Sequence, residues 1–159
     1  YSLELHRAGR FDPERARAAD IPLKYWNPLQ KGNTVEWEGR TYTPDMVMGA
    51  DRRGLKVTYC TDTRPVPVIA EYAKDSDLFI CEGMYGDPER LAHVKDHMHM
   101  LMQEGAALAK EANVKELWFT HYSPAEPHPQ DYLEQIRKIF DNTVIPKDGY
   151  GTELNFEEE

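Results

Sequence analysis

The sequence has few cysteines, no long apolar run and a shortage of positive charge. Its two cysteines are too few for a disulfide framework, which favours a cytoplasmic protein. No apolar stretch approaches the roughly 18 residues of a membrane span, and the mean hydropathy is −0.71. We therefore expect no membrane segment. Lysine and arginine number 19 against 28 aspartates and glutamates, a net charge of −9. Any RNA contact must therefore come from a local patch rather than the whole surface.

What is present is typical of a folded domain. The 159 residues suit one compact domain or a large piece of a bigger one. With 40% hydrophobic and 30% charged residues, the composition excludes intrinsic disorder. The chain starts at Tyr1 without an initiator methionine, a basic leader or an apolar leader segment. We therefore expect it to begin partway through a longer gene product.

The chain divides near residue 55. Residues 1–54 are irregular, with an expected strand over 1–6, a short helix opened by Asp12 and Pro13, and a hairpin over 34–43 that turns at Glu38-Gly39. A polar connector is expected over 49–54. Residues 55–159 alternate strands (55–60, 77–82, 116–120, 143–145, 150–154) with helices (65–74, 100–113, 131–140). This order predicts an α/β sheet with right-handed crossovers.

Polar side chains follow three of the expected strands where each one ends. Asp62 comes just after the first strand, Glu82 ends the second, and His121 follows the third. The carboxyl ends of parallel strands meet at one edge of a sheet, about 5 Å apart. We therefore expect these three side chains to converge at that edge.

Three histidines that precede the next expected helix could cover the same edge: His93, His97 and His99. They could equally be surface residues of a polar loop. Three methionines alternate with them (Met98, Met100 and Met102), and at helical spacing these are typical of packing. Cys60 and Cys81 lie within expected strands, where free cysteine behaves as a small hydrophobic residue.

Histidine and aspartate together allow metal chemistry. They are natural ligands of zinc or manganese, and one carboxylate can bridge two ions. Two such ions about 4 Å apart can activate water and hold a phosphodiester, while a further histidine protonates the leaving oxygen. An aspartate after a strand could instead accept a phosphoryl group, as in a receiver domain. The acidic pair and late-strand lysine that receiver chemistry needs are not seen here.

Four segments resemble the ribonuclease Z family, the tRNA 3′-processing endonucleases of the metallo-β-lactamase fold. Residues 60–65 (CTDTRP) resemble its Gly-Asp-Thr-Arg-Pro block, and residues 80–85 (ICEGMY) its His-Glu-Ala-Thr-Phe/Tyr block. Residues 109–124 resemble its stretch that ends Leu-Thr-His-Phe-Ser-Pro-Arg, and residues 141–149 its closing strand and Asp-Gly. The order and spacing hold over residues 1–154, so the combination is specific although each block is short.

The resemblance implies roles for six residues. Asp62 corresponds to the ligand that bridges the two metal ions, and His121 to the last metal-ligand histidine. His99, 22 residues before His121, corresponds to the catalytic histidine that assists the leaving group. Glu82 corresponds to the glutamate that orients this histidine. Two supporting residues shape the site: Thr63 and Arg64.

The resemblance also implies the fold, the cofactors and the partners. The α/β fold would be the second half of a metallo-β-lactamase αββα sandwich (residues 55–159), with an N-terminal arm-like insertion (residues 1–54) that resembles the family's tRNA-binding arm. The complete protein would hold two zinc ions, or manganese or another divalent metal. Its substrate would be precursor tRNA or another phosphodiester. Its partner would be a second copy, as a homodimer, or the missing N-terminal half.

The chain also departs from the family. The upstream His-Xaa-His-Xaa-Asp-His metal motif and the next ligand histidine are absent from it. No Gly-Pro pair stands in residues 21–28, and Ala125 follows Ser-Pro where arginine is common. We therefore expect the 159-residue chain alone to be inactive. Two alternatives stay open: a related hydrolase of small or cyclic phosphodiesters, and a non-enzymatic receiver-like or interaction domain.

Overall fold

The structure, a computed structural model, describes residues 1–157 and divides into two compact units. One unit is residues 6–54. The other combines Tyr1–Leu5 with the chain from Leu55 onward. The sequence predicts a division near residue 55, and the structure differs in giving the first five residues to the larger unit. They lie there because β1 (Ser2–Arg7) adds a strand to the sheet beside β4 (Arg52–Cys60).

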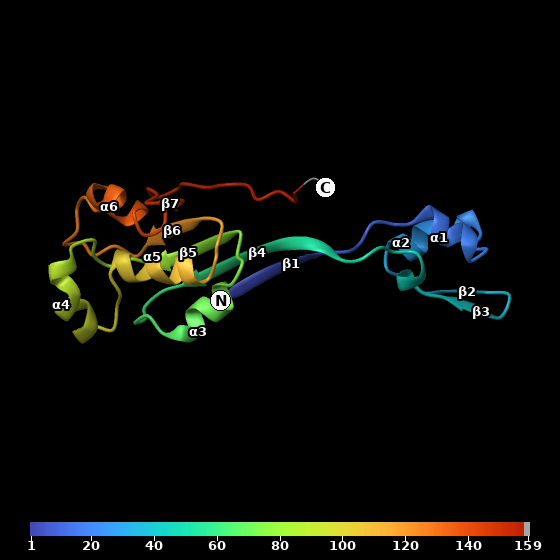
Figure 1. The fold of residues 1–159 in the computed structure, drawn as a ribbon, viewed down its shortest axis with the longest axis horizontal. Helices are drawn as coiled ribbons and strands as arrows, with labels where there is room; N and C mark the ends of the chain where they lie inside the picture. The colour runs from blue at the N-terminus through green and yellow to red at the C-terminus, as the bar shows by residue number, and fades with distance from the viewer. Residues whose placement is uncertain (158–159) are drawn as a thin grey trace. The chain divides into compact units, whose positions relative to one another are not determined.

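The larger unit is built on a five-stranded sheet in the order β1-β4-β5-β6-β7 (Figure 1). Its remaining strands are β5 (Leu78–Glu82), β6 (Leu117–Thr120) and β7 (Thr143–Val144). The strands from β4 to β7 pair in parallel, with Cys60 beside Cys81 and Glu82 beside Thr120. Their carboxyl ends therefore meet at one edge, as the sequence predicts.

β1 closes the other side of the sheet. The Tyr1 ammonium donates to the Tyr59 carbonyl at 2.8 Å, and the Tyr59 N–H donates to the Tyr1 carbonyl at 2.8 Å. Glu4 then pairs with Lys56 at 3.3 Å. Residue numbers rise along β1 as they fall along β4, so this pair is antiparallel. The pairing carries β4 back to Arg52, into the segment that the sequence predicts as a connector.

The described residues of the larger unit include the helices α3 (Pro67–Ala73), α4 (Leu91–Asp96), α5 (Met102–Glu111) and α6 (Leu133–Arg137). Short 3-10 turns precede two of them: η3 (Pro88–Arg90) and η4 (Pro129–Tyr132). The expected helices 65–74, 100–113 and 131–140 are confirmed, with shorter bounds. Helix α4 is a finding that the sequence did not predict. The expected strand over 150–154 is wrong, because this segment has no strand pairing and Tyr150 instead packs on the Trp118 ring.

The main core lies between the sheet and its helices. Phe79, Cys81, Leu117 and Phe119 point from β5 and β6 into this core and are buried. Side chains alternate across a strand, so the residues between them face the opposite side of the sheet. Gly105 lets α5 approach β6 closely, because a Cβ there would come within 2.7 Å of the Phe119 ring.

The smaller unit, residues 6–54, has elements and a core of its own. The elements are α1 (Pro13–Ala18), η1 (Leu23–Tyr25), α2 (Trp26–Gln30), β2 (Val35–Trp37), β3 (Arg40–Tyr42) and η2 (Pro44–Met46). Five buried side chains form the core: Ala16, Ile21, Leu29, Tyr42 and Val47.

Local sequence signals in the smaller unit act as expected. The Asp12 side chain accepts hydrogen bonds from the backbone N–H groups of Glu14 and Arg15, at 2.9 and 3.1 Å, and so caps α1. β2 and β3 pair antiparallel through a two-residue turn at Glu38 and Gly39, both with positive φ (48° and 75°). Positive φ at both positions is typical of a type I′ hairpin turn. The predicted helix start and hairpin are therefore confirmed.

Candidate metal centre

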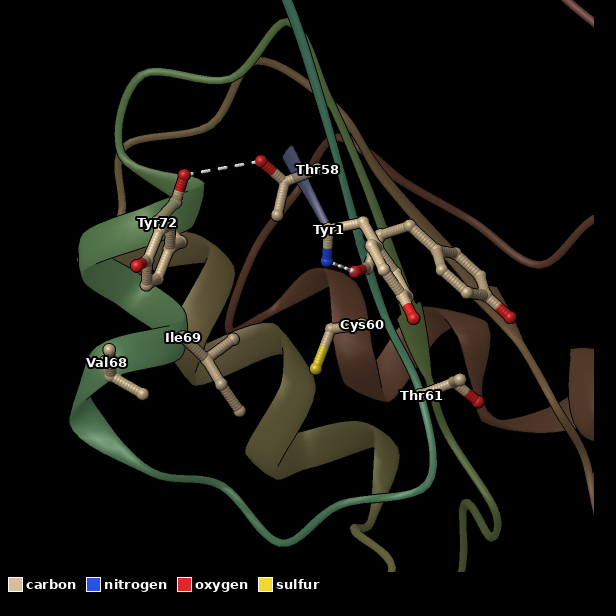
Figure 2. Close-up of a pocket in the computed structure, with 8 residues that line it drawn as sticks. Tyr1, Thr58, Cys60, Thr61, Val68, Ile69 and Tyr72 are labelled. Carbon is tan, nitrogen blue, oxygen red and sulfur yellow. Dashed lines mark hydrogen bonds between the residues drawn. The ribbon is translucent and has the colours of Figure 1, made fainter. Parts of the chain in front are cut away.

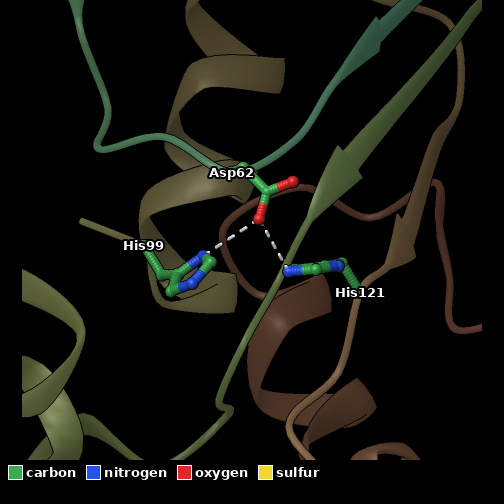
Figure 3. A group of neighbouring side chains, drawn as sticks. All are labelled: Asp62, His99 and His121. Carbon is green, nitrogen blue, oxygen red and sulfur yellow. Dashed lines mark ion pairs between the residues drawn. The ribbon is translucent and has the colours of Figure 1, made fainter. Parts of the chain in front are cut away.

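Three side chains at the carboxyl edge of the sheet lie close together (Figure 3). The Oδ1 atom of Asp62 is 3.0 Å from Nε2 of His121 and 4.0 Å from Nδ1 of His99. One ligand atom from each residue can be chosen so that all lie within 4.8 Å of one another. Figure 3 shows the Asp62 carboxylate between the two imidazole rings. The predicted convergence of Asp62 and His121 is therefore observed, and His99 joins them.

Asp62 and His121 reach this edge from β4 and β6, the strands on either side of β5. Both have left-handed backbone conformations, with φ of 52° and 60°. Such values are uncommon outside glycine and cost of order 1–3 kcal/mol each, and they concentrate at functional sites. Among the described residues, five other non-glycine residues also have positive φ, Glu38 of the hairpin turn included, so the case for a site depends on the side-chain geometry.

Glu82 lies at the end of β5, in contact with His99, and its side chain is fully buried. Its carboxylate accepts from the Thr63 N–H at 2.6 Å and the Met100 N–H at 3.2 Å, and lies 3.0 Å from Nδ1 of His99. A carboxylate only accepts hydrogen bonds, so this contact places the proton on Nδ1. In neutral His99 the lone pair is then on Nε2.

Arg64 joins the loop after β4 to the start of α5. Its guanidinium donates to the carbonyl of His99 and pairs with both carboxylate oxygens of Glu104. Thr63 contributes its backbone N–H to Glu82, and its hydroxyl donates to the Arg64 carbonyl at 2.9 Å. All six residues of the predicted site therefore lie in one connected network. Their chemical roles stay predictions.

The residues present fit a divalent metal ion. A carboxylate oxygen and two imidazole nitrogens within 4.8 Å of one another are hard and borderline donors of the kind that zinc and manganese take. Asp62 is the most exposed of the three, and His99 the least. The group is thus open on one side, where further ligands could approach.

His93 and His97 do not share this edge. In the part of the chain that the structure describes, the group of candidate ligands contains neither of them. His93 lies on α4 and His97 just after it, with ring centroids 4.2 Å apart, and His93 packs edge-on against Tyr85 at 5.5 Å. Both side chains are exposed, which agrees with the alternative that they are surface residues. The packing interpretation holds for Met100 and Met102, which are buried, whereas Met98 is exposed.

An apolar pocket near this edge belongs to α3 rather than to the site. It has a volume of about 210 Å³ and is lined by residues that include Thr58, Cys60, Ile69 and Tyr72 (Figure 2). None of the six predicted site residues lines it. The Cys81 thiol donates to the Met100 sulfur at 3.7 Å. Its interaction with Cys60 and its burial raise the pKa of Cys81, and the same interaction lowers the pKa of Cys60. Cys81 is a buried core residue, as expected.

Glu104 is the residue of this network that the sequence did not single out. It accepts the Leu101 N–H at 2.9 Å, in the first turn of α5, as well as binding Arg64. A glutamate at the third position of a helix is a known signal for capping of the helix start. That signal could have marked the helix start, but not the partnership with Arg64, which is 40 residues away.

Comparisons with known proteins agree with this geometry. The Beta-lactamase superfamily domain matches residues 21–122, more than half of the chain. The chain belongs to this family. The expected metallo-β-lactamase fold is thereby confirmed, and use of a divalent metal follows from the family. Relatives named ribonuclease Z, 54–55% identical to this chain, confirm the resemblance to ribonuclease Z. Among the described residues, no helix has both the length and the apolar character that a membrane crossing requires.

Curated relatives carry the name ribonuclease Z. The protein from Agathobacter rectalis is 55% identical over 159 residues, and that from Lachnospira eligens is 54% identical over the same length. Each match covers 100% of this chain and 52% of the relative. The chain therefore spans about half the length of the curated relatives it matches.

Solved structures agree on the fold. The metallo-β-lactamase fold protein YhfI from Bacillus subtilis matches 60% of this chain and 39% of its own, with a TM-score of 0.52 and 26% identity. The short form of human tRNase Z matches 67% of this chain and 36% of its own, with a TM-score of 0.51 and 20% identity. The second likeness supports the fold alone.

Proposed function

We propose that the longest natural polypeptide containing this chain is a metal-dependent phosphodiester hydrolase that processes the 3′ end of precursor tRNA. The observation that carries the proposal is the group of Asp62, His99 and His121, held by buried Glu82, in a chain 55% identical to a protein named ribonuclease Z. Because the chain spans about half of such relatives, the remaining metal ligands would come from residues outside it.

Asp62 and His121 would hold metal in this proposal, with Asp62 as the bridging ligand. Zinc takes both imidazole and carboxylate donors, and manganese takes carboxylate oxygens. The bound metal would supply an activated water and stabilise charge on the phosphodiester. Doubly protonated His99 would give its Nε2 proton to the leaving oxygen and become the neutral Nδ1–H form, and Glu82 would hold the ring in place by accepting from Nδ1.

The charge of residues 6–54 supports an RNA-contacting role for this unit. It has nine lysines and arginines against seven acidic residues, whereas the rest of the chain has ten against 21. Aromatic residues stand beside two of these cations, with Arg17 over Trp26 at 5.7 Å and Lys24 over Tyr25 at 4.7 Å. Interleaved cationic and aromatic side chains suit a nucleic-acid surface, because phosphates and bases can both bind there.

An uncovered part of the sheet supports a partner for the larger unit. Leu3, Leu5 and Tyr59 lie on β1 and β4 with 74%, 57% and 39% of their surfaces exposed. They face away from the core that packs on the helices. Large apolar patches rarely stay bare, and the relatives have a second half of similar length. We assign that half, rather than a second copy of this chain, as the covering partner.

A deletion separates tRNA processing from hydrolysis of small phosphodiesters. The two ends of residues 11–47 lie close together, since the Gly49 N–H donates to the Arg10 carbonyl at 2.8 Å and the Asp12 N–H to the Val47 carbonyl at 2.7 Å. Replacing residues 11–47 by Asn-Gly in the longest natural polypeptide should lower kcat/KM for precursor tRNA by at least about tenfold, equal to about 1.4 kcal/mol. Turnover of bis(p-nitrophenyl) phosphate should be unchanged.

Turnover of bis(p-nitrophenyl) phosphate is the control, because it reports whether the site at the carboxyl edge of the sheet is intact. Equal loss with both substrates would show that the deletion damaged the fold. Unchanged cleavage of precursor tRNA would contradict the role of residues 6–54. If the wild-type polypeptide cleaves only the small diester, the alternative of a small or cyclic phosphodiester hydrolase is correct.

A further inference from the structure

The backbone of residues 99–101 is held at three successive points. The His99 carbonyl accepts from Arg64, the Met100 N–H donates to Glu82 at 3.2 Å, and the Leu101 N–H donates to Glu104 at 2.9 Å. Two carboxylates and one guanidinium therefore fix the segment that carries the His99 ring. Glu82 also binds the ring itself, whereas Arg64 and Glu104 bond to the backbone of this segment and to each other.

Arg64 and Glu104 form a well-shielded two-point pair. Nη1 of Arg64 lies 2.8 Å from Oε2 of Glu104, and Nη2 contacts Oε1. The side chains are only 18% and 23% exposed. Bidentate pairs of this kind fix orientation as well as adding energy, because both groups are planar and rigid. The carboxylate thereby fixes the plane in which Arg64 presents Nη1 to the His99 carbonyl.

The pair does more than cap a helix. One oxygen of Glu104 would be enough to accept the Leu101 N–H, yet the second oxygen is used by Arg64. Arg64 in turn lies two residues after Asp62. The network therefore links the loop that carries the candidate metal ligand to the segment that carries His99.

We propose that Glu104 is a positioning residue for His99 and that it acts through Arg64. In this role it sets the backbone at His99 so that Nδ1 keeps its bond to Glu82 while the ring faces Asp62 and His121. The hydrogen bonds of Glu104 go to Arg64 and to the Leu101 N–H rather than to the ring. The part of this proposal that concerns rate rests on the proposed function, and the part that concerns the His99 ring does not.

The test compares Glu104→Gln, Arg64→Lys and the double variant with wild type. Glutamine keeps the length and an acceptor for the Leu101 N–H but loses the ion pair. Lysine keeps the charge but cannot make the two-point contact. Glu111→Gln is the matched control, since Glu111 ends the same helix and is exposed. Two-bond ¹H–¹⁵N spectra of the histidine rings report the tautomer of His99, and steady-state cleavage of precursor tRNA reports kcat and KM, both in the longest natural polypeptide.

The proposal expects His99 to hold the Nδ1–H tautomer in wild type and Glu111→Gln, and to lose it in part in Glu104→Gln. In Glu104→Gln, kcat should fall by about 10–100-fold with little change in KM, the size of loss typical when a residue that orients a metal-site side chain is changed. The kcat of the double variant should be no lower than that of the slower single variant, because Glu104 acts on His99 through Arg64.

An unchanged His99 spectrum in Glu104→Gln would overturn the proposal, as would a loss confined to KM or additive effects in the double variant. If wild type cleaves no precursor tRNA, the proposed function fails. The spectra then decide the positioning role alone, since an altered tautomer supports it and an unaltered one refutes it.

Discussion

The metal edge, the carboxyl edge of the sheet where Asp62, His99 and His121 meet, and the unit of residues 6–54 are stabilised in different ways. At the edge, buried Glu82 makes three polar contacts and Arg64 joins two further segments. The smaller unit instead has five buried side chains, most of them aliphatic, in a compact core. Its surface carries a small excess of positive charge, against a large excess of negative charge in the rest of the chain. The difference indicates that the larger unit holds polar side chains in fixed positions, whereas the smaller unit is a folded support for its charged surface.

Removal of the central carboxylate should have the largest effect. In Glu82→Ala, the His99 ring and two backbone N–H groups lose their buried acceptor. We expect the free energy of unfolding to fall by about 3–5 kcal/mol, measured by urea denaturation. Glu71→Ala, at an exposed position of α3, is the control and should change stability by less than about 0.5 kcal/mol. A loss below about 1 kcal/mol for Glu82→Ala would show that this carboxylate does not organise the edge.

A cavity in the smaller unit should weaken that unit alone. Leu29 is fully buried in its core, so Leu29→Ala should cost about 2–5 kcal/mol there. Amide exchange should accelerate in residues 6–54 and stay slow in β5 and β6. Leu23→Ala, at a position that is 74% exposed, should leave both regions unchanged. Equally faster amide exchange in β5 and β6 would contradict this expectation, because the two units would then unfold together.

The hairpin turn should give the smallest effect. Gly39 has a φ of +75° with open space around it, so the cost of Gly39→Ala comes from backbone strain alone. We expect a loss of about 1 kcal/mol, seen as faster amide exchange in β2 and β3. Gly151→Ala is the control, since Gly151 also has open space but no positive φ. If both substitutions are neutral, the turn does not constrain this unit.

The sequence predicts the parts of the fold that depend on local pattern and topology. Parallel strands bring their ends to one edge, so Asp62, Glu82 and His121 could be placed together from order alone. The capping of α1 by Asp12 and the Glu38-Gly39 turn are equally local. Strand order says nothing of what each site residue does, and their expected roles depend on the resemblance to ribonuclease Z.

The errors arise where structure depends on distant contacts. Residues 150–154 alternate like a strand, yet no neighbouring strand pairs with them, and Tyr150 packs on Trp118 instead. β4 starts at Arg52 because β1, some 50 residues earlier, pairs with it. Glu104 was missed because its partner Arg64 lies 40 residues away. Periodicity within a short window cannot report such partners.

The metal edge itself is tested most directly by metal content per chain, measured by elemental mass spectrometry on the longest natural polypeptide. Wild type and Asp45→Asn, an exposed site in the smaller unit, should hold the same number of divalent ions. Asp62→Asn should lose at least one of them, because it removes the carboxylate that we propose as the bridging ligand. Full retention of metal in Asp62→Asn would contradict the account, since the edge formed by Asp62, His99 and His121 would then not be the metal centre.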